Sequence, residues 1–216
     1  MKSTHFLLLP LILFAAAIAQ ANEPAKEAGP KVNAADPTKG QAIASKVCIA
    51  CHNADGNSTI TANPKLAGQN AEYLYKQLKS FKSVDGKPAE RANAVMMGMT
   101  GGLSDEDMHN VAAWFASQTL KPGNAKNKDT LEQGKKLYRG GDLAKGIAAC
   151  AGCHGPAGSG IPVQYPRIGG QHADYMEAQL KAFRTGQRAN AAMKLVAIKM
   201  TDEEIGAVSD YIAGLH

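Results

Sequence analysis

The stretch Cys48-Ile49-Ala50-Cys51-His52 and its second copy, Cys150-Ala151-Gly152-Cys153-His154, decide how this chain folds. Each copy places two thiols one helical turn apart and a histidine directly after the second thiol. Thiols at this spacing can form thioethers with the two vinyl groups of one haem, and the next residue then lies beneath the iron. Cys-x-x-Cys-His is the attachment pattern of c-type haem. The sequence therefore predicts two covalently bound haem c groups, with His52 and His154 as axial iron ligands.

Other uses of paired cysteines fit this sequence less well. A thioredoxin-like pair would lie near a βαβ pattern, and none is visible around these motifs. A zinc ribbon would hold its two pairs about 15–20 residues apart, far closer than Cys51 is to Cys150. Structural disulfides, which are common in exported proteins, would not require a histidine after each second cysteine. Haem attachment alone explains all four cysteines and both histidines.

The sequence after each motif is also repeated. Pro64-Lys65-Leu66-Ala67-Gly68-Gln69 matches Pro166-Arg167-Ile168-Gly169-Gly170-Gln171, and Arg91-Ala92-Asn93-Ala94 matches Arg188-Ala189-Asn190-Ala191. Between these two matches the first copy has extra residues around Ser83 to Glu90. Such a repeat indicates two domains that arose from one duplication.

The repeat also selects candidates for the sixth iron ligand. A thioether suits low-spin haem iron, and Met/His ligation raises the reduction potential. Aligning Arg91 with Arg188 places Met96 opposite Met193, and no other methionine of the two copies has a methionine partner. We therefore predict that Met96 and Met193 are ligands; a core role, which is usual for methionine, is the alternative. The neighbouring candidates are Met97, Met99 and Met200.

Of the remaining histidines, His5 lies within residues 1–21, which have the pattern of a signal peptide. His109 and His172 are not shared between the two copies and His216 is the last residue, so these three are predicted to lie at the surface. Haem iron held by two histidines stays open as an alternative to Met/His ligation.

The segments around the motifs are predicted to be helices joined by glycine-rich loops, because no convincing alternating strand is present. Asp36-Pro37 is typical of an N-cap followed by proline at the first helical position. Thr130-Leu131-Glu132-Gln133 has the pattern of a capping box. The last helix of each copy is predicted to start at Ser104 and at Thr201, each of which is followed by acidic residues. The predicted fold class is therefore all-α.

The chain begins with a pattern typical of export. Residues 1–21 have a lysine near the start, an apolar stretch and a small-x-small cleavage pattern that ends at Ala21, so they are predicted to be a signal peptide that is removed. An uncleaved membrane anchor is the alternative. Removing these residues removes one lysine and no acid, so the net charge falls from +5 to +4. The basic residues are spread along the chain, and nucleic-acid binding is therefore not expected.

The rest of the chain divides by composition. Residues 22–35 are rich in Ala, Lys, Pro and Glu and are predicted to be flexible. Residues 36–120 and 129–216 are predicted to be the first and second domains, and residues 121–128, with proline and glycine, the linker between them. Each domain is small for a stable core. A covalently held haem would supply much of the missing apolar core.

The tandem Cys-x-x-Cys-His motifs, the Pro-x-(Leu/Ile)-x-Gly-Gln motifs and the late methionines resemble the tandem dihaem class I cytochromes c of the cytochrome c4 family. The resemblance covers essentially the whole mature chain. It implies two class I cytochrome c folds related by pseudo-twofold symmetry, each around one covalent haem. It also implies the axial pairs His52 with Met96 and His154 with Met193. The carbonyls of Pro64 and Pro166 would accept hydrogen bonds from these histidines.

The resemblance further implies a periplasmic electron carrier, often at the membrane surface, that passes electrons towards a terminal oxidase. Its expected partners are membrane-bound respiratory complexes. Two six-coordinate irons would leave no position open for a substrate, so an enzyme is not expected. The alternative is a dihaem enzyme such as a peroxidase, which needs an open iron site and groups that handle protons. A third class, a haem-bearing subunit of a larger complex, is left open.

Overall fold

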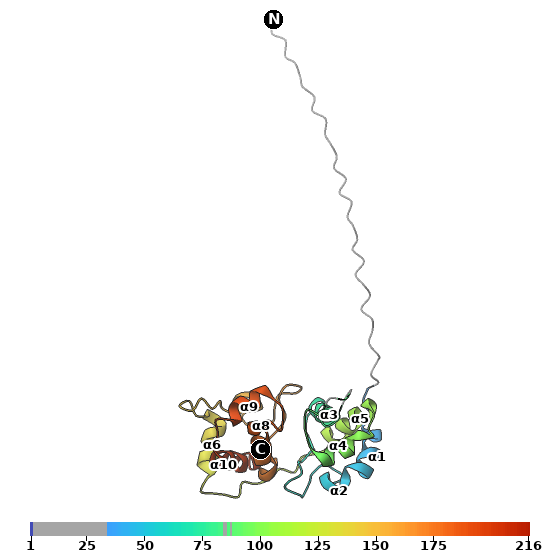
Figure 1. Ribbon diagram of the computed structural model, residues 1–216, viewed down its shortest axis with the longest axis horizontal. Helices are drawn as coiled ribbons and strands as arrows, with labels where there is room; N and C mark the ends of the chain where they lie inside the picture. Colours follow the sequence, from blue (N-terminus) through green and yellow to red (C-terminus); the bar gives the residue numbers. More distant parts are fainter. Residues whose placement is uncertain (2–33, 84–85, 87) are drawn as a thin grey trace. The chain divides into compact units, whose positions relative to one another are not determined.

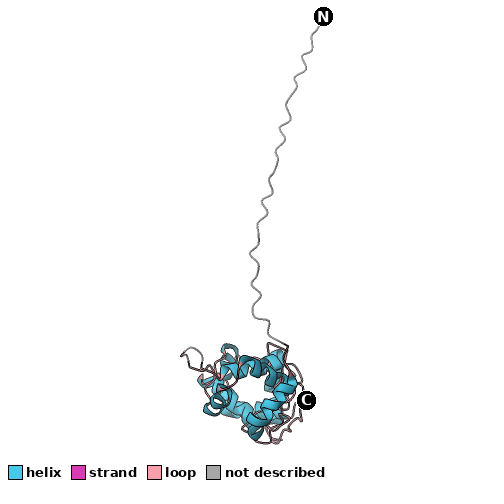
Figure 2. Cartoon of the chain, turned by 90° about the vertical axis from the view of Figure 1, so that its right-hand side faces the viewer, coloured by secondary structure: helices cyan, strands magenta, loops and turns pink. Residues whose placement is uncertain are grey.

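The computed structural model describes residue 1, residues 34–83, residue 86 and residues 88–216. These residues form ten α-helices and isolated bridges but no strand, which confirms the all-α prediction (Figure 2). Apart from residue 1, the predicted signal peptide, residues 1–21, lies outside the described residues, as does nearly all of the predicted flexible segment, residues 22–35. In the part that is described, no helix has the length and apolar character needed to cross a membrane.

The helices occur in two sets of five with the same order (Figure 1). In each set a longer helix is followed by a one-turn helix, two middle helices and a final helix. The first set is α1 (Pro37–Val47), α2 (Ile49–His52), α3 (Ala71–Ser80), α4 (Ala94–Gly101) and α5 (Asp105–Ala116). The second set is α6 (Leu131–Gly140), α7 (Ala151–His154), α8 (Ala173–Thr185), α9 (Ala191–Ala197) and α10 (Asp202–Ala213).

Glycines allow the first and last helix of each set to cross at short range. A Cβ atom placed on Gly40 of α1 would lie 2.0 Å from the carbonyl oxygen of Asn110 in α5. A Cβ atom on Gly134 of α6 would lie 2.2 Å from the carbonyl oxygen of Ala207 in α10. No side chain fits at such distances, so the two helix crossings depend on glycine.

Most of the predicted helix starts are confirmed. The Asp36 carboxylate caps α1 by accepting from the backbone N–H of Thr38 at 2.8 Å. Ser104 and Thr201 each form a complete capping box with the acidic residue three positions later. The capping box predicted at Thr130 is wrong, although α6 does begin at the next residue. Thr130 has φ −99° and ψ −3°, and in this helical conformation its side chain makes no cap hydrogen bond.

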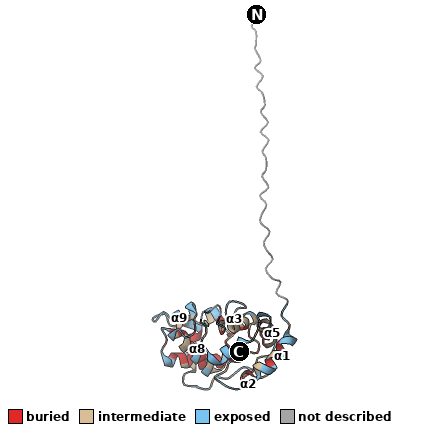
Figure 3. Cartoon of the chain, turned by 45° about the vertical axis from the view of Figure 1, so that its right-hand side comes forward, coloured by how far each residue is buried: buried red, intermediate tan, exposed pale blue. Residues whose placement is uncertain are grey.

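Each set of helices encloses its own apolar core (Figure 3). The final helices carry buried apolar stripes. They are Met108, Val111 and Phe115 on α5, and Ile205, Val208 and Ile212 on α10. Burying one such side chain stabilises the fold by roughly 1.5–3 kcal/mol. The motif cysteines Cys48 and Cys150 pack against the edges of the two cores.

The two halves contact one another through pairs of equivalent residues. The Arg91 guanidinium donates to the hydroxyl of Tyr175 and to the side-chain oxygen of Gln179, both at 2.8 Å. In the equivalent arrangement on the other half, the Arg188 guanidinium donates to the hydroxyl of Tyr73 at 2.7 Å. The backbones of Arg91 and Arg188 also pair as an isolated antiparallel β-bridge. This reciprocity is what pseudo-twofold symmetry between the halves requires.

The segment predicted as a linker, residues 121–128, is bonded to both halves. The backbone N–H of Lys121 donates to the side-chain oxygen of Asn57 at 2.7 Å. Further along, the N–H of Lys126 donates to the Asp210 carboxylate at 2.8 Å. The segment therefore connects the two halves in sequence and is also hydrogen-bonded to each of them.

Candidate haem-binding sites

The one-turn helices α2 and α7 place each motif histidine inside its half. The backbone N–H of His52 donates to the carbonyl of Cys48 at 3.0 Å, and that of His154 to Cys150 at 2.9 Å. The helix ends directly after the histidine, at Asn53 with φ 59° and at Gly155 with φ 80°. Both imidazoles are only 7% exposed. Each motif thus presents two thiols and one buried imidazole from a single helical turn.

A backbone carbonyl group accepts a hydrogen bond from the Nδ1 atom of each imidazole. His52 Nδ1 lies 2.9 Å from the Pro64 carbonyl oxygen, and His154 Nδ1 lies 3.0 Å from that of Pro166. Both predicted hydrogen bonds are therefore confirmed. Because a carbonyl can only accept, Nδ1 carries the proton and Nε2 is left with its lone pair. This is the tautomer that binds a metal through Nε2.

Burial also sets the charge of these imidazoles. It lowers the pKa of both His52 and His154, and the hydrogen bond to the proline carbonyl opposes this only in part. Neutral imidazole is therefore favoured at neutral pH. Metal binding requires this form, because a protonated nitrogen has no lone pair to give.

The four cysteines are free of disulfides. Cys48, Cys51 and Cys150 are partly exposed, whereas Cys153 is exposed. Burial raises the pKa of the Cys48 and Cys150 thiols to about 11. Paired thiols, a neutral imidazole and an adjacent apolar core are together the set of groups that a covalently bound haem needs, so the residues present fit the cofactor.

The methionine candidates occupy different environments. Asn93 caps α4 and Asn190 caps α9, and each accepts from the N–H of the third helical residue, Met96 or Met193, at 2.9 Å. Both of these methionines are half-buried, and Met193 packs against the second core. Met200 is instead 4% exposed and lies within that core. The structure thus places Met96 and Met193 at equivalent positions.

The two alternative methionines of α4 lie nearer to the solvent. Met97 is 36% exposed and Met99 is 45% exposed. Neither has a methionine at the equivalent position of α9. The lower exposure of Met96 and Met193 therefore agrees with the alignment of the repeat.

Sequence reasoning missed the role of the last residue of each Pro-x-x-x-Gly-Gln motif. Gln69 and Gln171 are 7% and 8% exposed, and each side chain reaches the other half of the protein. Their presence in both copies was the available signal. His172, predicted to lie free at the surface, is half-buried, and its Nε2 lies 2.8 Å from the carbonyl oxygen of Ser58. His172 therefore forms a contact between the halves, because Ser58 belongs to the first half and His172 directly precedes α8 in the second.

Comparison with known proteins agrees with this geometry. The family model for cytochrome c matches residues 37–119 and again residues 131–216. Two helical domains of this family, each with one Cys-x-x-Cys-His motif, define a dihaem c-type cytochrome. The protein therefore carries two covalently bound haem c groups. When bound, each haem supplies an iron that gains or loses one electron.

Individual relatives identify the family. The chain is 46% identical over 188 residues to cytochrome c4 of Pseudomonas aeruginosa, with 85% of this chain and 90% of that protein covered. The structure of reduced cytochrome c4 from Pseudomonas stutzeri matches with a TM-score of 0.79 and 43% identity, over 85% of this chain and all of that one. A thiosulfate dehydrogenase electron acceptor of Thiomonas intermedia is 38% identical, with 77% of both chains covered. The chain belongs to the cytochrome c4 family of electron-transfer proteins, and such a protein exchanges electrons with redox partners.

Proposed function

We propose that this protein is a periplasmic electron carrier in which His52 with Met96, and His154 with Met193, are the axial iron ligands. The observation that carries the proposal is the equivalence of the two sites. In both, the histidine is buried and neutral, and its Nδ1 is bonded to a proline carbonyl. In both, a half-buried methionine occupies the third position of a helix capped by asparagine.

These residues are suited to electron transfer without further chemistry. The proline carbonyl fixes the ring plane and tautomer of each histidine, so the ligand needs little rearrangement when the charge of the iron changes. A methionine thioether as the second ligand would favour the ferrous state relative to harder donors and would occupy the iron position that a substrate needs. The protein then acts as a carrier and not as an enzyme.

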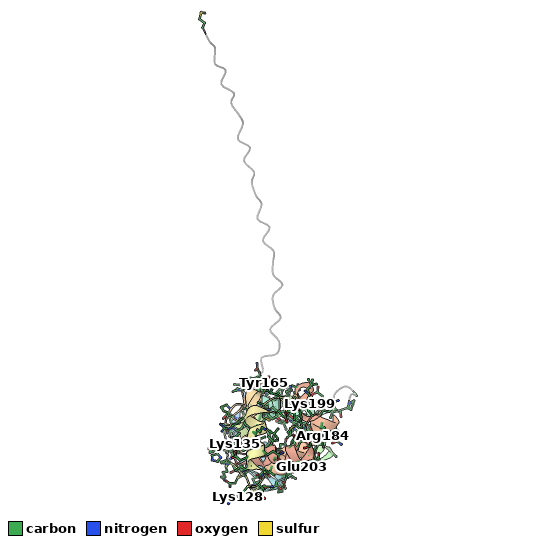
Figure 4. The ribbon with its side chains drawn as sticks, turned by 90° about the vertical axis from the view of Figure 1, so that its left-hand side faces the viewer. Lys128, Lys135, Tyr165, Arg184, Lys199 and Glu203 are labelled. Atoms are coloured by element: carbon green, nitrogen blue, oxygen red, sulfur yellow. The ribbon has the colours of Figure 1, made fainter. Side chains whose placement is uncertain are left out.

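Exposed apolar side chains on the methionine helices favour contact with redox partners. Val95 on α4 is 61% exposed and Leu195 on α9 is 67% exposed. Elsewhere on the second half, basic and acidic side chains share one face, among them Lys135, Lys199 and Glu203 (Figure 4). We propose that partners dock over α4 and α9 through apolar contacts, with little steering by a field of one sign.

The proposed partners are respiratory-chain components, with a terminal oxidase as acceptor and the membrane surface as the place of contact. One of the relatives is named as an electron acceptor of thiosulfate dehydrogenase. We accordingly propose that the protein receives its electrons from a dehydrogenase. The proposal of export is based on the signal-peptide pattern of residues 1–21. N-terminal sequencing should therefore find a mature chain that begins at Asn22.

We also propose the domain limits 36–120 and 129–216 with the linker 121–128. The ranges matched by the family model and the bonds of the linker to both halves support these limits.

One experiment tests the central proposal. Mass spectrometry of the purified protein should show two haems attached to the mature chain, with no thiol left free. A redox titration should then remove two electrons, and the oxidised protein should show the weak methionine-to-iron absorption band for both haems. High-spin haem that turns over peroxide would instead establish the enzyme.

Single alanine variants assign the first methionine. Met96→Ala should abolish the sulfur band of the first haem, whereas Met97→Ala and Met99→Ala should retain it. If Met99→Ala abolishes the band and Met96→Ala does not, the ligand assignment in the first half is wrong.

A further inference from the structure

Each half of the protein holds the peptide group that positions the haem histidine of the other half. The peptide group between Pro64 and Lys65 has two hydrogen bonds in opposite directions. Its carbonyl accepts from His52 Nδ1 at 2.9 Å. Its N–H, which belongs to Lys65, donates to the side-chain oxygen of Gln171 at 2.8 Å. Gln171 lies in the second half, so the support of the first histidine includes a residue from the other domain.

The peptide group between Pro166 and Arg167 in the second half has the same two hydrogen bonds. The carbonyl of Pro166 accepts from His154 at 3.0 Å, and the next N–H, that of Arg167, donates to the side-chain oxygen of Gln69 at 2.9 Å. Each half therefore contributes one glutamine to the histidine support of the other.

The glutamines are held firmly enough to act in this way. The Gln171 side-chain nitrogen donates to the Lys65 carbonyl at 2.9 Å, so one carboxamide binds both backbone groups of Lys65. Its oxygen also accepts from the N–H of His172 at 3.0 Å. The Gln69 side-chain nitrogen donates to the Arg167 carbonyl at 2.8 Å. Because a backbone N–H can only donate, these partners fix which end of each carboxamide is oxygen.

A peptide group bonded at both ends transmits polarisation. When its N–H donates to an acceptor, its carbonyl oxygen becomes more negative and accepts more strongly. A stronger acceptor draws the Nδ1 proton of the histidine and makes Nε2 a better donor to a metal. A more basic ligand stabilises the ferric state more than the ferrous state, and hydrogen bonding around the ligands is a known control of haem potential.

We propose that Gln171 lowers the reduction potential of the first haem and Gln69 that of the second, each acting across the domain boundary through the proline peptide. Both are positioning residues, because neither touches the histidine that it influences. The proposal rests on the proposed function, since it takes His52 and His154 to be the iron ligands. It follows that each haem reports on whether the two halves are joined.

The test replaces each glutamine with methionine, which is of similar length and neutral but offers no strong acceptor. A redox titration followed by NMR reads each haem separately through its own resonances. Gln171→Met should raise the potential of the first haem and leave the second unchanged, and Gln69→Met should do the reverse. The expected change in the ferric-to-ferrous equilibrium is roughly two- to fivefold, which for a one-electron couple is about 20–40 mV.

The crossed pattern separates this role from a purely structural one. Local damage would shift the haem of the half that carries the substitution, and separation of the halves would shift both haems. Either result, or no shift at all, would overturn the proposal. His172→Asn is the matched control: it removes another bond between the halves and places there the residue found at the equivalent position 70. It should change neither potential, and a shift equal to that of Gln171→Met would also overturn the proposal.

Two further measurements keep the test decisive. If a variant does not fold, the reduced native protein should still show scalar coupling across the hydrogen bond between the Lys65 amide nitrogen and the Gln171 side-chain carbonyl carbon. Absence of that coupling would overturn the proposal. The absorption spectrum of the native protein reports histidine and methionine ligation, and it does so independently of the potentials of the glutamine variants. Loss of the crossed shifts with intact ligation therefore rejects the glutamine role alone, whereas absent ligation rejects the proposed function.

Discussion

Gly134 is a position where a single added methyl group should destabilise the second half. It lies on α6 where this helix crosses α10. An added Cβ would meet the carbonyl oxygen of Ala207 at 2.2 Å and the Cβ of Tyr211 at 2.8 Å, whereas real Cβ atoms stay at least 3.0 Å from their neighbours. The helices would have to move apart by most of an ångström at the edge of the core that surrounds the haem motif.

The magnitude follows from two opposing effects. Overpacking of this kind costs typically about 1–3 kcal/mol, and a clash with backbone belongs at the upper end of that range. Alanine in place of glycine returns up to about 1 kcal/mol in helix propensity. Gly134→Ala should therefore lower the free energy of unfolding of the second half by about 1–2 kcal/mol. For a domain of this size that is a fall in Tm of roughly 4–16 °C.

The same helix contains the matched control. Nothing lies within 4 Å of a Cβ placed on Gly140, the last residue of α6. Gly140→Ala should therefore stabilise the half by up to about 1 kcal/mol. Thermal unfolding followed by circular dichroism, together with the sulfur band of the second haem, measures both variants. If the two substitutions change Tm in the same direction, the close helix crossing does not have the role argued for it.

Further expectations concern the sulfur ligand and the linker. Met193→Ala should remove the sulfur band of the second haem and lower its potential while that of the first haem stays unchanged; Met200→Ala, in the core, should keep both bands but cost about 2–5 kcal/mol of stability. Redox titration and denaturant unfolding distinguish the two outcomes. The Lys121 ammonium, which bonds to the Asp55 carboxylate at 2.9 Å, lowers the pKa of that carboxyl from 3.8 to about 2, together with hydrogen bonds from the backbone N–H and the side chain of Asn57. A lowered pKa stabilises the folded state above pH 3.8, and this contribution is lost as the pH falls through about 2. The pair is largely exposed, so Asp55→Asn should cost no more than about 1 kcal/mol at pH 6; urea unfolding should show the deficit shrinking towards pH 2, and a deficit independent of pH would contradict the assignment.

The cofactor, the fold class and the helix starts could be predicted because they depend on residues that are close in sequence. Two thiols and an imidazole within five positions are brought together by one helical turn, whatever the rest of the chain does. The N-caps at Asp36, Ser104 and Thr201 likewise need only a side chain and a backbone N–H two or three residues away. The repeat extended this local information, because alignment of the two copies singled out Met96 and Met193.

Tertiary structure alone decided which residues connect the halves. Gln171 is more than a hundred positions from the Lys65 amide that it holds, and no periodicity or spacing relates the two. His172 could not be distinguished from a surface histidine until the Ser58 carbonyl was placed beside it. At Thr130 the sequence carried the capping pattern, but the turn before α6 places the residue in a helical conformation in which its hydroxyl cannot cap. Local chemistry is encoded in neighbouring residues, whereas a hydrogen bond between domains exists only after two separately folded surfaces meet.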